Sequence, residues 1–249
     1  MLDKDYNYYL FDVDRTIWAF DKNAHSAICK LLDHFFVGER FGITDKDEFV
    51  NRYEKINRYL WERYEAGEIT KEVLRSSRFL HTFKSYFKHE TEDGRSINEY
   101  SANYKKIKKL SDKFTSAYVE QMVMETALEP GADIVLRSLH ERGKKIAVIT
   151  NGFAEMQYRK LANSRIGEYI DAYIISEEVG YLKPHPNIFN AALKALNGVK
   201  SETLMVGDDF ANDIEGARAF GVDQYYYNPF HKGYDNPPTY DKPTLLNLI

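Results

Sequence analysis

The sequence has little of what marks several classes of protein. Its only cysteine, Cys29, leaves no internal disulfide and no metal site of the Cys-x-x-Cys kind, which fits a reducing compartment. No apolar run approaches the ~18 residues of a membrane span, and the first residues, MLDKDYNYYLFDVD, carry acids where a signal peptide carries bases. We therefore expect a soluble, cytoplasmic protein that has no membrane partner.

Long runs of one charge sign are also missing. The 34 basic and 38 acidic residues are spread along 249 positions and leave a formal net charge of -4. This balance argues against a nucleic-acid polymer as the partner. The length suits one sizeable core, or one core that carries a smaller insertion.

What the sequence does contain is an alternation of strand and helix patterns. Short apolar runs with the character of doubly buried strands occur at residues 8–13, 145–150, 172–176, 204–207 and 224–227. Helical patterns precede the last four runs, at residues 131–142, 154–162, 186–196 and 213–220. We therefore predict an α/β fold, with a doubly wound, parallel, Rossmann-like sheet and right-handed crossovers.

One interval interrupts this alternation. The distance along the chain from Asp12 to Thr150 far exceeds the about a dozen residues that a crossover needs. Within it, apolar residues recur at three- and four-residue spacing over residues 47–65, 71–87 and 98–123. Breaks fall at Gly67 and at residues 91–96. We predict a core of residues 1–21 and 125–249 and an inserted helical cap of residues 22–124.

Acidic residues gather where two of the predicted strands end. Asp12 and Asp14 follow the first strand two positions apart, so they can converge on a ligand at its carboxyl end. Loop capping explains an isolated Asp-x-Asp equally well. After the fourth strand, the acids Asp208, Asp209 and Asp213 fall within six positions. They would repel one another unless a cation lay among them.

Two further segments supply groups that suit an anion. Thr150-Asn151-Gly152 ends the second strand with a hydroxyl, an amide and a glycine whose N–H can approach an anion closely. Alone, such a triplet is more often a turn. Lys183 follows the third strand, and a lone lysine there is usually a solvated surface residue. Strand ends that gather this many acids nevertheless need a fixed cation nearby.

Together these segments resemble the haloacid dehalogenase (HAD) superfamily. Four signatures occur in that superfamily's order: DVDRT at 12–16, TNG at 150–152, Lys183 with Pro184, and GDDFAND at 207–213. The helical insertion resembles the superfamily's C1 cap. The resemblance implies a Mg²⁺-dependent phosphatase that acts on a small phosphomonoester as a monomer or a homodimer. Asp14 favours a phosphatase over a dehalogenase, which has no acid at that position.

The resemblance also implies a role for each matching residue. Asp12 would be the nucleophile that forms an aspartyl-phosphate, and Asp14 the general acid and then the general base. The Mg²⁺ ligands would be Asp12, Asp208 and the backbone carbonyl of Asp14, with Asp213 in support. The phosphoryl group would be held by Thr150, Asn151, Gly152 and Lys183, of which Thr150 and Lys183 also count as catalytic.

A narrower resemblance bears on the substrate. Residues 57–61, 64–70 and 75–79 resemble the branch of the house-cleaning pyrimidine 5′-nucleotidases. That branch implies a nucleoside 5′-monophosphate whose base is held near Gly67 and Arg78 of the cap. The alternative is a sugar-phosphate phosphatase or phosphomutase of the same superfamily. A phospho-receiver domain or a non-catalytic binding protein is a more remote alternative.

One position departs from the superfamily's pattern. Arg15 stands where glycine is most common, and it either pairs with a carboxylate of the cap or approaches the substrate. Trp18 and Phe20 are expected to pack at the hinge rather than to stack on a base. We expect His185 to be a surface loop residue.

Overall fold

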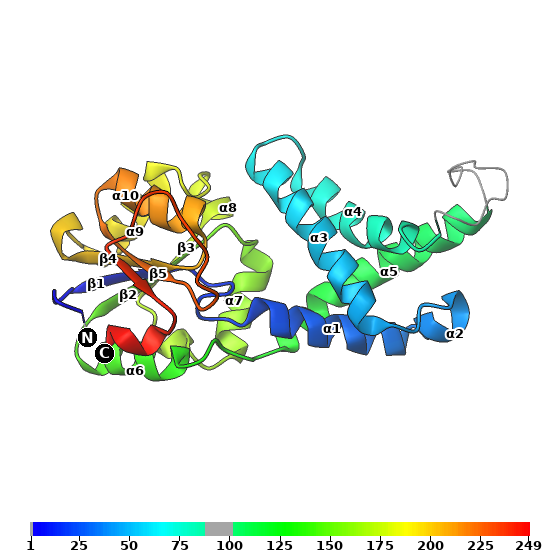
Figure 1. The fold of residues 1–249 in the computed structure, drawn as a ribbon, viewed down its shortest axis with the longest axis horizontal. Helices are drawn as coiled ribbons and strands as arrows, with labels where there is room; N and C mark the ends of the chain where they lie inside the picture. The colour runs from blue at the N-terminus through cyan, green and yellow to red at the C-terminus, as the bar shows by residue number, and fades with distance from the viewer. Residues whose placement is uncertain (1, 88–101) are drawn as a thin grey trace. The chain divides into compact units, whose positions relative to one another are not determined.

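The computed structural model describes residues 2–87 and 102–249, and the chain divides into two compact units (Figure 1). The α/β unit consists of Met1–Asn23 and Glu125–Ile249. The helical unit consists of Ala24–Met124. Within the described residues, no helix combines the length and the hydropathy that a membrane span requires.

The α/β unit is built on one parallel sheet with the strand order β3-β2-β1-β4-β5-β6. The strands are β1 (Tyr8–Phe11), β2 (Lys145–Thr150), β3 (Ala172–Ile175), β4 (Thr203–Gly207), β5 (Asp223–Tyr227) and β6 (Tyr240–Lys242). The predicted α/β fold and its five strands are confirmed, whereas β6 was not predicted. The strand order reverses at β1, and ligands of open α/β sheets bind outside the carboxyl ends of the strands at such a point.

Helices cover both faces of this sheet (Figure 1). They are α6 (Ala132–Glu141), α7 (Ala154–Asn163), α8 (Ser176–Val179), α9 (Pro186–Leu196) and α10 (Gly216–Phe220). On the face of α9 and α10, Leu10, Ile149 and Met205 of the strands pack with Phe189 in one apolar core. The predicted helix at 213–220 differs, because a π-helical turn, Phe210–Glu215, precedes α10.

The helical unit contains most of α1 (Phe20–His34), together with α2 (Val37–Phe41), α3 (Lys46–Glu65), α4 (Lys71–Lys84) and α5 (Ala102–Met124). Asp45 and Thr70 cap α3 and α4, because their side chains accept backbone N–H groups of the first turn. Aromatic rings form the core, with Phe79 centred 4.8 Å from Tyr53 and 4.7 Å from Phe114.

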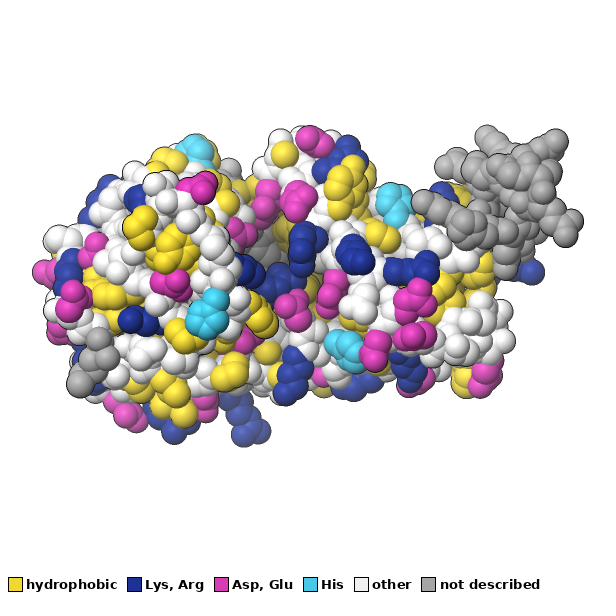
Figure 2. All heavy atoms as spheres, viewed as in Figure 1, with side chains coloured by type: hydrophobic (Ala, Val, Ile, Leu, Met, Phe, Trp, Pro, Cys, Tyr) yellow, Lys and Arg dark blue, Asp and Glu magenta, His cyan; other side chains and the backbone are white. Residues whose placement is uncertain are grey.

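The predicted helices of this unit are present, with α4 ending before residue 87. The predicted break at 91–96 and the start of the helix predicted from residue 98 lie outside the described residues. Gly67 adopts φ +73° in the turn after α3, a conformation that glycine enters without a steric penalty. Among the described residues, the surface of the chain has no large patch of one charge sign on the face drawn in Figure 2, where basic and acidic side chains are interspersed.

Candidate active site

The first two acids of the site follow β1 directly. Asp12 extends the strand's pairing, since its N–H donates to the carbonyl of Val206 at 2.9 Å. The chain then turns, and the N–H groups of Ile17 and Trp18 both donate to the carbonyl of Val13. Asp12 is buried and Asp14 is partly exposed. The two carboxylates are therefore placed in different surroundings although they are two residues apart.

Lys183 joins Asp12 to Asp213. Its Nζ donates to Asp12 Oδ1 at 2.5 Å and to Asp213 Oδ1 at 2.7 Å, and all three side chains are buried. Burial raises the pKa of both carboxyls, with Lys183 acting in the opposite direction. Burial alone would lower the pKa of Lys183, but the two carboxylates outweigh it and raise that pKa. The predicted fixed cation thus lies between the acids of two strand ends.

The segment after β4 is shaped to bury Asp213. Asp209 begins the π-helical turn as its N-cap, and its Oδ1 accepts the N–H of Asn212 at 2.9 Å. The N–H of Asp209 in turn donates to Asp213 Oδ2 at 3.1 Å. Gly207 leaves the room, because a Cβ atom there would overlap Asp213 Oδ2. Asp209, which had no assigned role, therefore acts in the structure as a cap.

Asp208 completes a cluster of carboxylates. Thr16 Oγ1 donates to its Oδ1 at 3.4 Å. Burial raises the pKa of Asp208 to about 7, and the charge of Asp12 adds to the rise. Carboxylate oxygens of Asp12, Asp208 and Asp213 lie within 4.8 Å of one another. This set of hard oxygen atoms fits a divalent cation such as Mg²⁺.

The three carboxylates differ in what they have left to offer a cation. Both oxygens of Asp213 already accept hydrogen bonds, from Lys183 and from the N–H of Asp209. Asp12 uses only Oδ1 for Lys183. Asp12 and Asp208 therefore have more free carboxylate oxygen to offer a cation than Asp213 has.

Thr150, at the end of β2, has a hydroxyl hydrogen to spare. Its Oγ1 accepts the N–H of Gly152 at 3.0 Å and Nε2 of Gln157 at 3.2 Å. These two bonds occupy the lone pairs of the oxygen. Among the described residues, no acceptor is seen for the hydroxyl hydrogen. It is available to an anion.

The Asn151 side chain holds the loop of Lys183. Its Oδ1 accepts the N–H of Lys183 at 2.7 Å, and its Nδ2 donates to the carbonyl of Lys183 at 3.1 Å. The amide thus ties the end of β2 to the loop after α8. Sequence reasoning placed Asn151 beside the anion and did not anticipate this tie.

Two residues of α7 reach Asp14 and were missed in the sequence. Lys160 Nζ donates to its Oδ1 at 2.7 Å, and Gln157 Nε2 donates to its Oδ2 at 2.8 Å. The available signal was their three-residue spacing on a predicted helix, which places both side chains on one face. Polar residues on one face of a helix ordinarily indicate that this face is exposed to solvent, so the signal was weak.

The residues after Asp14 form a packed turn. Arg15 adopts φ +68°, the left-handed region that favours glycine. Its Nη2 lies 2.7 Å from Asp21 Oδ1, and Asp21 belongs to the α/β unit rather than to the helical one. Trp18 is fully buried and contacts Phe20 edge-on, which agrees with packing rather than base stacking. His185, which was expected to be a surface loop residue, is exposed and caps α9.

The helical unit contains a buried cation of its own. Arg78 of α4 is 5% exposed, and its guanidinium lies 4.8 Å from the ring centre of Tyr118. Its Nε has no hydrogen-bond partner among the described residues. Gly67, the other residue expected near the base, is exposed in the turn that follows α3.

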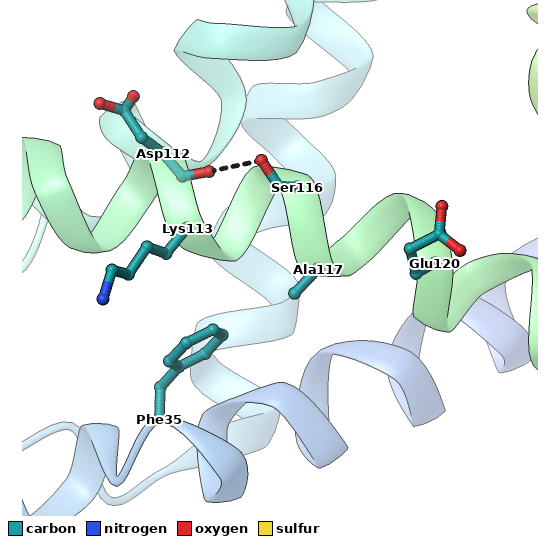
Figure 3. A pocket seen from close by; sticks show the side chains of 6 residues that line it. All are labelled: Phe35, Asp112, Lys113, Ser116, Ala117 and Glu120. Atoms are coloured by element: carbon teal, nitrogen blue, oxygen red, sulfur yellow. Dashed lines mark hydrogen bonds between the residues drawn. The ribbon is translucent and has the colours of Figure 1, made fainter.

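A surface hollow of about 600 Å³ also belongs to the helical unit (Figure 3). It lies between the ring of Phe35 and α5, and its lining consists of Phe35, Asp112, Lys113, Ser116, Ala117 and Glu120. None of the strand-end residues lines it, so it is not part of the candidate site.

Known proteins resemble this chain over most of its length. Pyrimidine 5′-nucleotidase PynA of Streptococcus pneumoniae is 29% identical over 247 residues, which cover 98% of this chain and 94% of PynA. Pyrimidine 5′-nucleotidase YjjG of Escherichia coli is 29% identical over 228 residues, which cover 91% and 88%.

A solved structure and a family model agree with this likeness. The magnesium-bound crystal structure of YfnB from Bacillus subtilis, which is assigned to the HAD hydrolases, superposes with a TM-score of 0.79. It is 26% identical and is matched over 98% of this chain and 97% of YfnB. The family model of haloacid dehalogenase-like hydrolases matches residues 6–221. The chain belongs to the haloacid dehalogenase-like hydrolase family.

Proposed function

We propose that the protein is a Mg²⁺-dependent phosphatase that hydrolyses small phosphomonoesters through an aspartyl-phosphate on Asp12. The observation that carries this proposal is the pairing of Lys183 with Asp12 and Asp213 at adjoining strand ends. Phosphoryl transfer needs a nucleophile, donors for the phosphoryl oxygens and a proton for the leaving oxygen. Asp12 is the candidate nucleophile. Lys183 and Thr150 are the candidate donors to the phosphoryl oxygens, and Asp14 is the candidate proton donor.

The reaction then has two steps. An oxygen of Asp12 bonds to phosphorus as the bond from phosphorus to the leaving oxygen breaks, and Asp14 gives that oxygen a proton. Next, the oxygen of a water molecule bonds to phosphorus while the bond to Asp12 breaks, and Asp14 takes the water's proton. Lys183 and the spare hydrogen of Thr150 stabilise the phosphoryl oxygens throughout.

Asp12 and Asp208, with the backbone carbonyl of Asp14 and Asp213 in support, would hold the Mg²⁺. When bound, Mg²⁺ would neutralise charge on the phosphoryl oxygens. Asp12 keeps Oδ2 apart from its bond to Lys183, so one carboxylate can serve both the cation and Lys183.

For the substrate we propose a nucleoside 5′-monophosphate. Support comes from the likeness to two pyrimidine 5′-nucleotidases over 91% or more of the chain, the helical unit included. We assign catalysis to the α/β unit, and substrate selection to the helical unit as a cap. The buried Arg78 is a candidate group for selection.

The test is release of inorganic phosphate from UMP, glucose 6-phosphate and p-nitrophenyl phosphate, with Mg²⁺ and with a chelator. We expect turnover that needs Mg²⁺, favours UMP and is lost in Asp12→Asn but not in the control Lys194→Met, an exposed lysine of α9. Phosphate release that survives Asp12→Asn would contradict the nucleophile.

Other outcomes identify the alternatives. Equal rates for UMP and glucose 6-phosphate would remove the nucleotidase assignment and leave a general phosphatase. Isomerised sugar phosphate in place of inorganic phosphate would indicate a mutase. A long-lived phosphoprotein without turnover would indicate a receiver.

A further inference from the structure

Two buried polar side chains of α7 hold the carboxylate of Asp14 from one side. Lys160 Nζ donates to Oδ1 at 2.7 Å and Gln157 Nε2 donates to Oδ2 at 2.8 Å. Gln157 is 1% and Lys160 2% exposed, whereas the Asp14 side chain is 23% exposed. Each oxygen of Asp14 therefore has a fixed donor from the protein, while part of the carboxylate stays accessible.

Lys160 is directed at Asp14 by its surroundings. Asp14 is the one carboxylate that accepts a bond from it among the described residues. Its Nζ otherwise lies over aromatic rings, 4.2 Å from the centre of Trp18 and 5.5 Å from that of Phe20. Such rings attract a cation but accept no ordinary hydrogen bond. Lysine is almost never this buried unless it is paired, so its place here depends on Asp14.

Gln157 links Asp14 to the end of β2. The same Nε2 that donates to Asp14 donates to Thr150 Oγ1 at 3.2 Å. Gly152 leaves the room for this amide, because a Cβ atom there would overlap Gln157 Nε2. The other end of the amide, Oε1, is buried without a donor among the described residues. A buried acceptor without a partner opposes folding, so the amide is not explained by stability.

We propose that Gln157 and Lys160 are positioning residues that fix the carboxyl of Asp14 for proton transfer, a role that rests on the proposed function. A carboxylate oxygen can accept two hydrogen bonds, and α7 supplies one to each oxygen of Asp14. The remaining lone pairs can carry the proton that moves to the leaving oxygen in the first step. They can also take the proton that water releases in the second.

This role has a signature that misfolding or a displaced nucleophile lacks. An alkyl phosphate such as UMP releases an alkoxide, which needs a proton, whereas p-nitrophenolate is a stable anion that leaves without one. The ratio kcat/KM covers the reaction only through the first irreversible step, departure of the leaving group. Loss of a positioned acid must therefore lower kcat/KM for UMP more than for p-nitrophenyl phosphate.

The experiment measures kcat/KM for both substrates in Lys160→Met, Gln157→Leu and Asp14→Asn, with Lys194→Met as the matched control. General acid catalysis contributes about 10²–10⁴-fold, so we expect Asp14→Asn to lower the UMP value by about that factor. Lys160→Met and Gln157→Leu are expected to lower it at least about tenfold more than the p-nitrophenyl phosphate value. Lys160→Arg should recover part of the loss, since it restores a donor to Asp14.

A double mutant separates this role from a general one. In the Asp14→Asn background, Lys160→Met should change the ratio of the two kcat/KM values no further, because the group that it positions is gone. An equal fall for both substrates in Lys160→Met and Gln157→Leu, or no fall, would overturn the proposal while Asp14→Asn still discriminates. If Asp14→Asn itself does not discriminate, the acid role of Asp14 fails and the positioning role fails with it.

Discussion

Asp213 occupies the space that a side chain at Gly207 would need. A Cβ atom at position 207 would overlap Asp213 Oδ2, and Asp213 is completely buried. The carboxylate is held there by the N–H of Asp209 and by Lys183 Nζ. The absence of a side chain at the end of β4 is thus a condition for the pairing of Lys183 with Asp213.

Gly207→Ala is expected to displace Asp213 and with it Lys183. Overpacking a closely packed site costs about 1–3 kcal/mol, so the free energy of unfolding in urea should fall by about that amount, and kcat should fall with it. Gly233→Ala is the matched control, because a Cβ atom there meets no atom within 4 Å. Wild-type stability and kcat in Gly207→Ala would show that Asp213 does not need this space.

At position 15, glycine should give a more stable protein than alanine, which is the reverse of the order within a helix. At φ +68° a residue with a Cβ atom is strained by about 1–2 kcal/mol, so Arg15→Gly should be more stable to urea than Arg15→Ala by about 1 kcal/mol. Both variants lose the ion pair with Asp21 and the contact with the Phe20 ring. At Lys194, within α9, alanine should instead exceed glycine by about 1 kcal/mol. The same order at both positions would contradict the strain at Arg15.

Local patterns predicted the strands and helices that bury continuous apolar runs. The helix at 186–196 and the strand at 145–150 have the predicted bounds, since each has a strong pattern and a clear start. β6 was missed because Tyr240–Lys242 is short, polar and only partly buried. Its position depends on pairing with β5, which a local pattern does not encode.

In the candidate site, too, some residues could be predicted from local patterns and others could not. The acids at strand ends were predictable, because parallel strands bring their carboxyl ends to one edge of the sheet. The partners of those acids were not. Lys160 and Gln157 reach Asp14 from a helix that is far from it in sequence, and Asn151 bonds to the backbone of Lys183. Such pairings depend on tertiary packing and on side-chain rotamers.

Asp171, just before β3, should make stability depend on pH. Burial alone would raise its pKa, but hydrogen bonds from Lys145 Nζ at 2.8 Å and the N–H of Ile146 at 2.9 Å outweigh burial and lower the pKa. The stabilisation is present above the unfolded value of about 3.9 and is lost as pH falls through the folded value.

Asp171→Asn should therefore lower the free energy of unfolding by about 1 kcal/mol at pH 7, discounted for solvent screening. The difference from wild type should shrink at pH 3, because the carboxyl of the unfolded chain binds a proton below about pH 3.9 and this favours unfolding of the wild type. Urea unfolding at the two pH values measures it. A difference that grows on acidification would have the wrong sign for a lowered pKa.

Lys183 should be needed for stability as well as for turnover. Removing one partner of a buried ion pair costs about 3–5 kcal/mol, and Lys183→Met would leave Asp12 and Asp213 buried together without their cation. Asp213→Asn in the same chain should recover part of that stability and no activity, because a charge is removed but the donor stays absent. The control Lys194→Met should match wild type. If the double variant were less stable than Lys183→Met, charge repulsion would not be the cause.

Magnesium should compensate for this lost charge. A ligand that binds only the folded state raises the free energy of unfolding, by about 2.7 kcal/mol at a hundred times its Kd. Lys183→Met removes a positive charge that lies 2.5 Å from Asp12 and 2.7 Å from Asp213, so the cluster of Asp12, Asp208 and Asp213 carries more uncompensated negative charge and attracts a cation more strongly. Mg²⁺ should therefore raise the Tm of this inactive variant more than that of wild type, and Asp208→Asn should abolish the rise. If Mg²⁺ changed the Tm of neither protein, this would argue against a cation site at these acids.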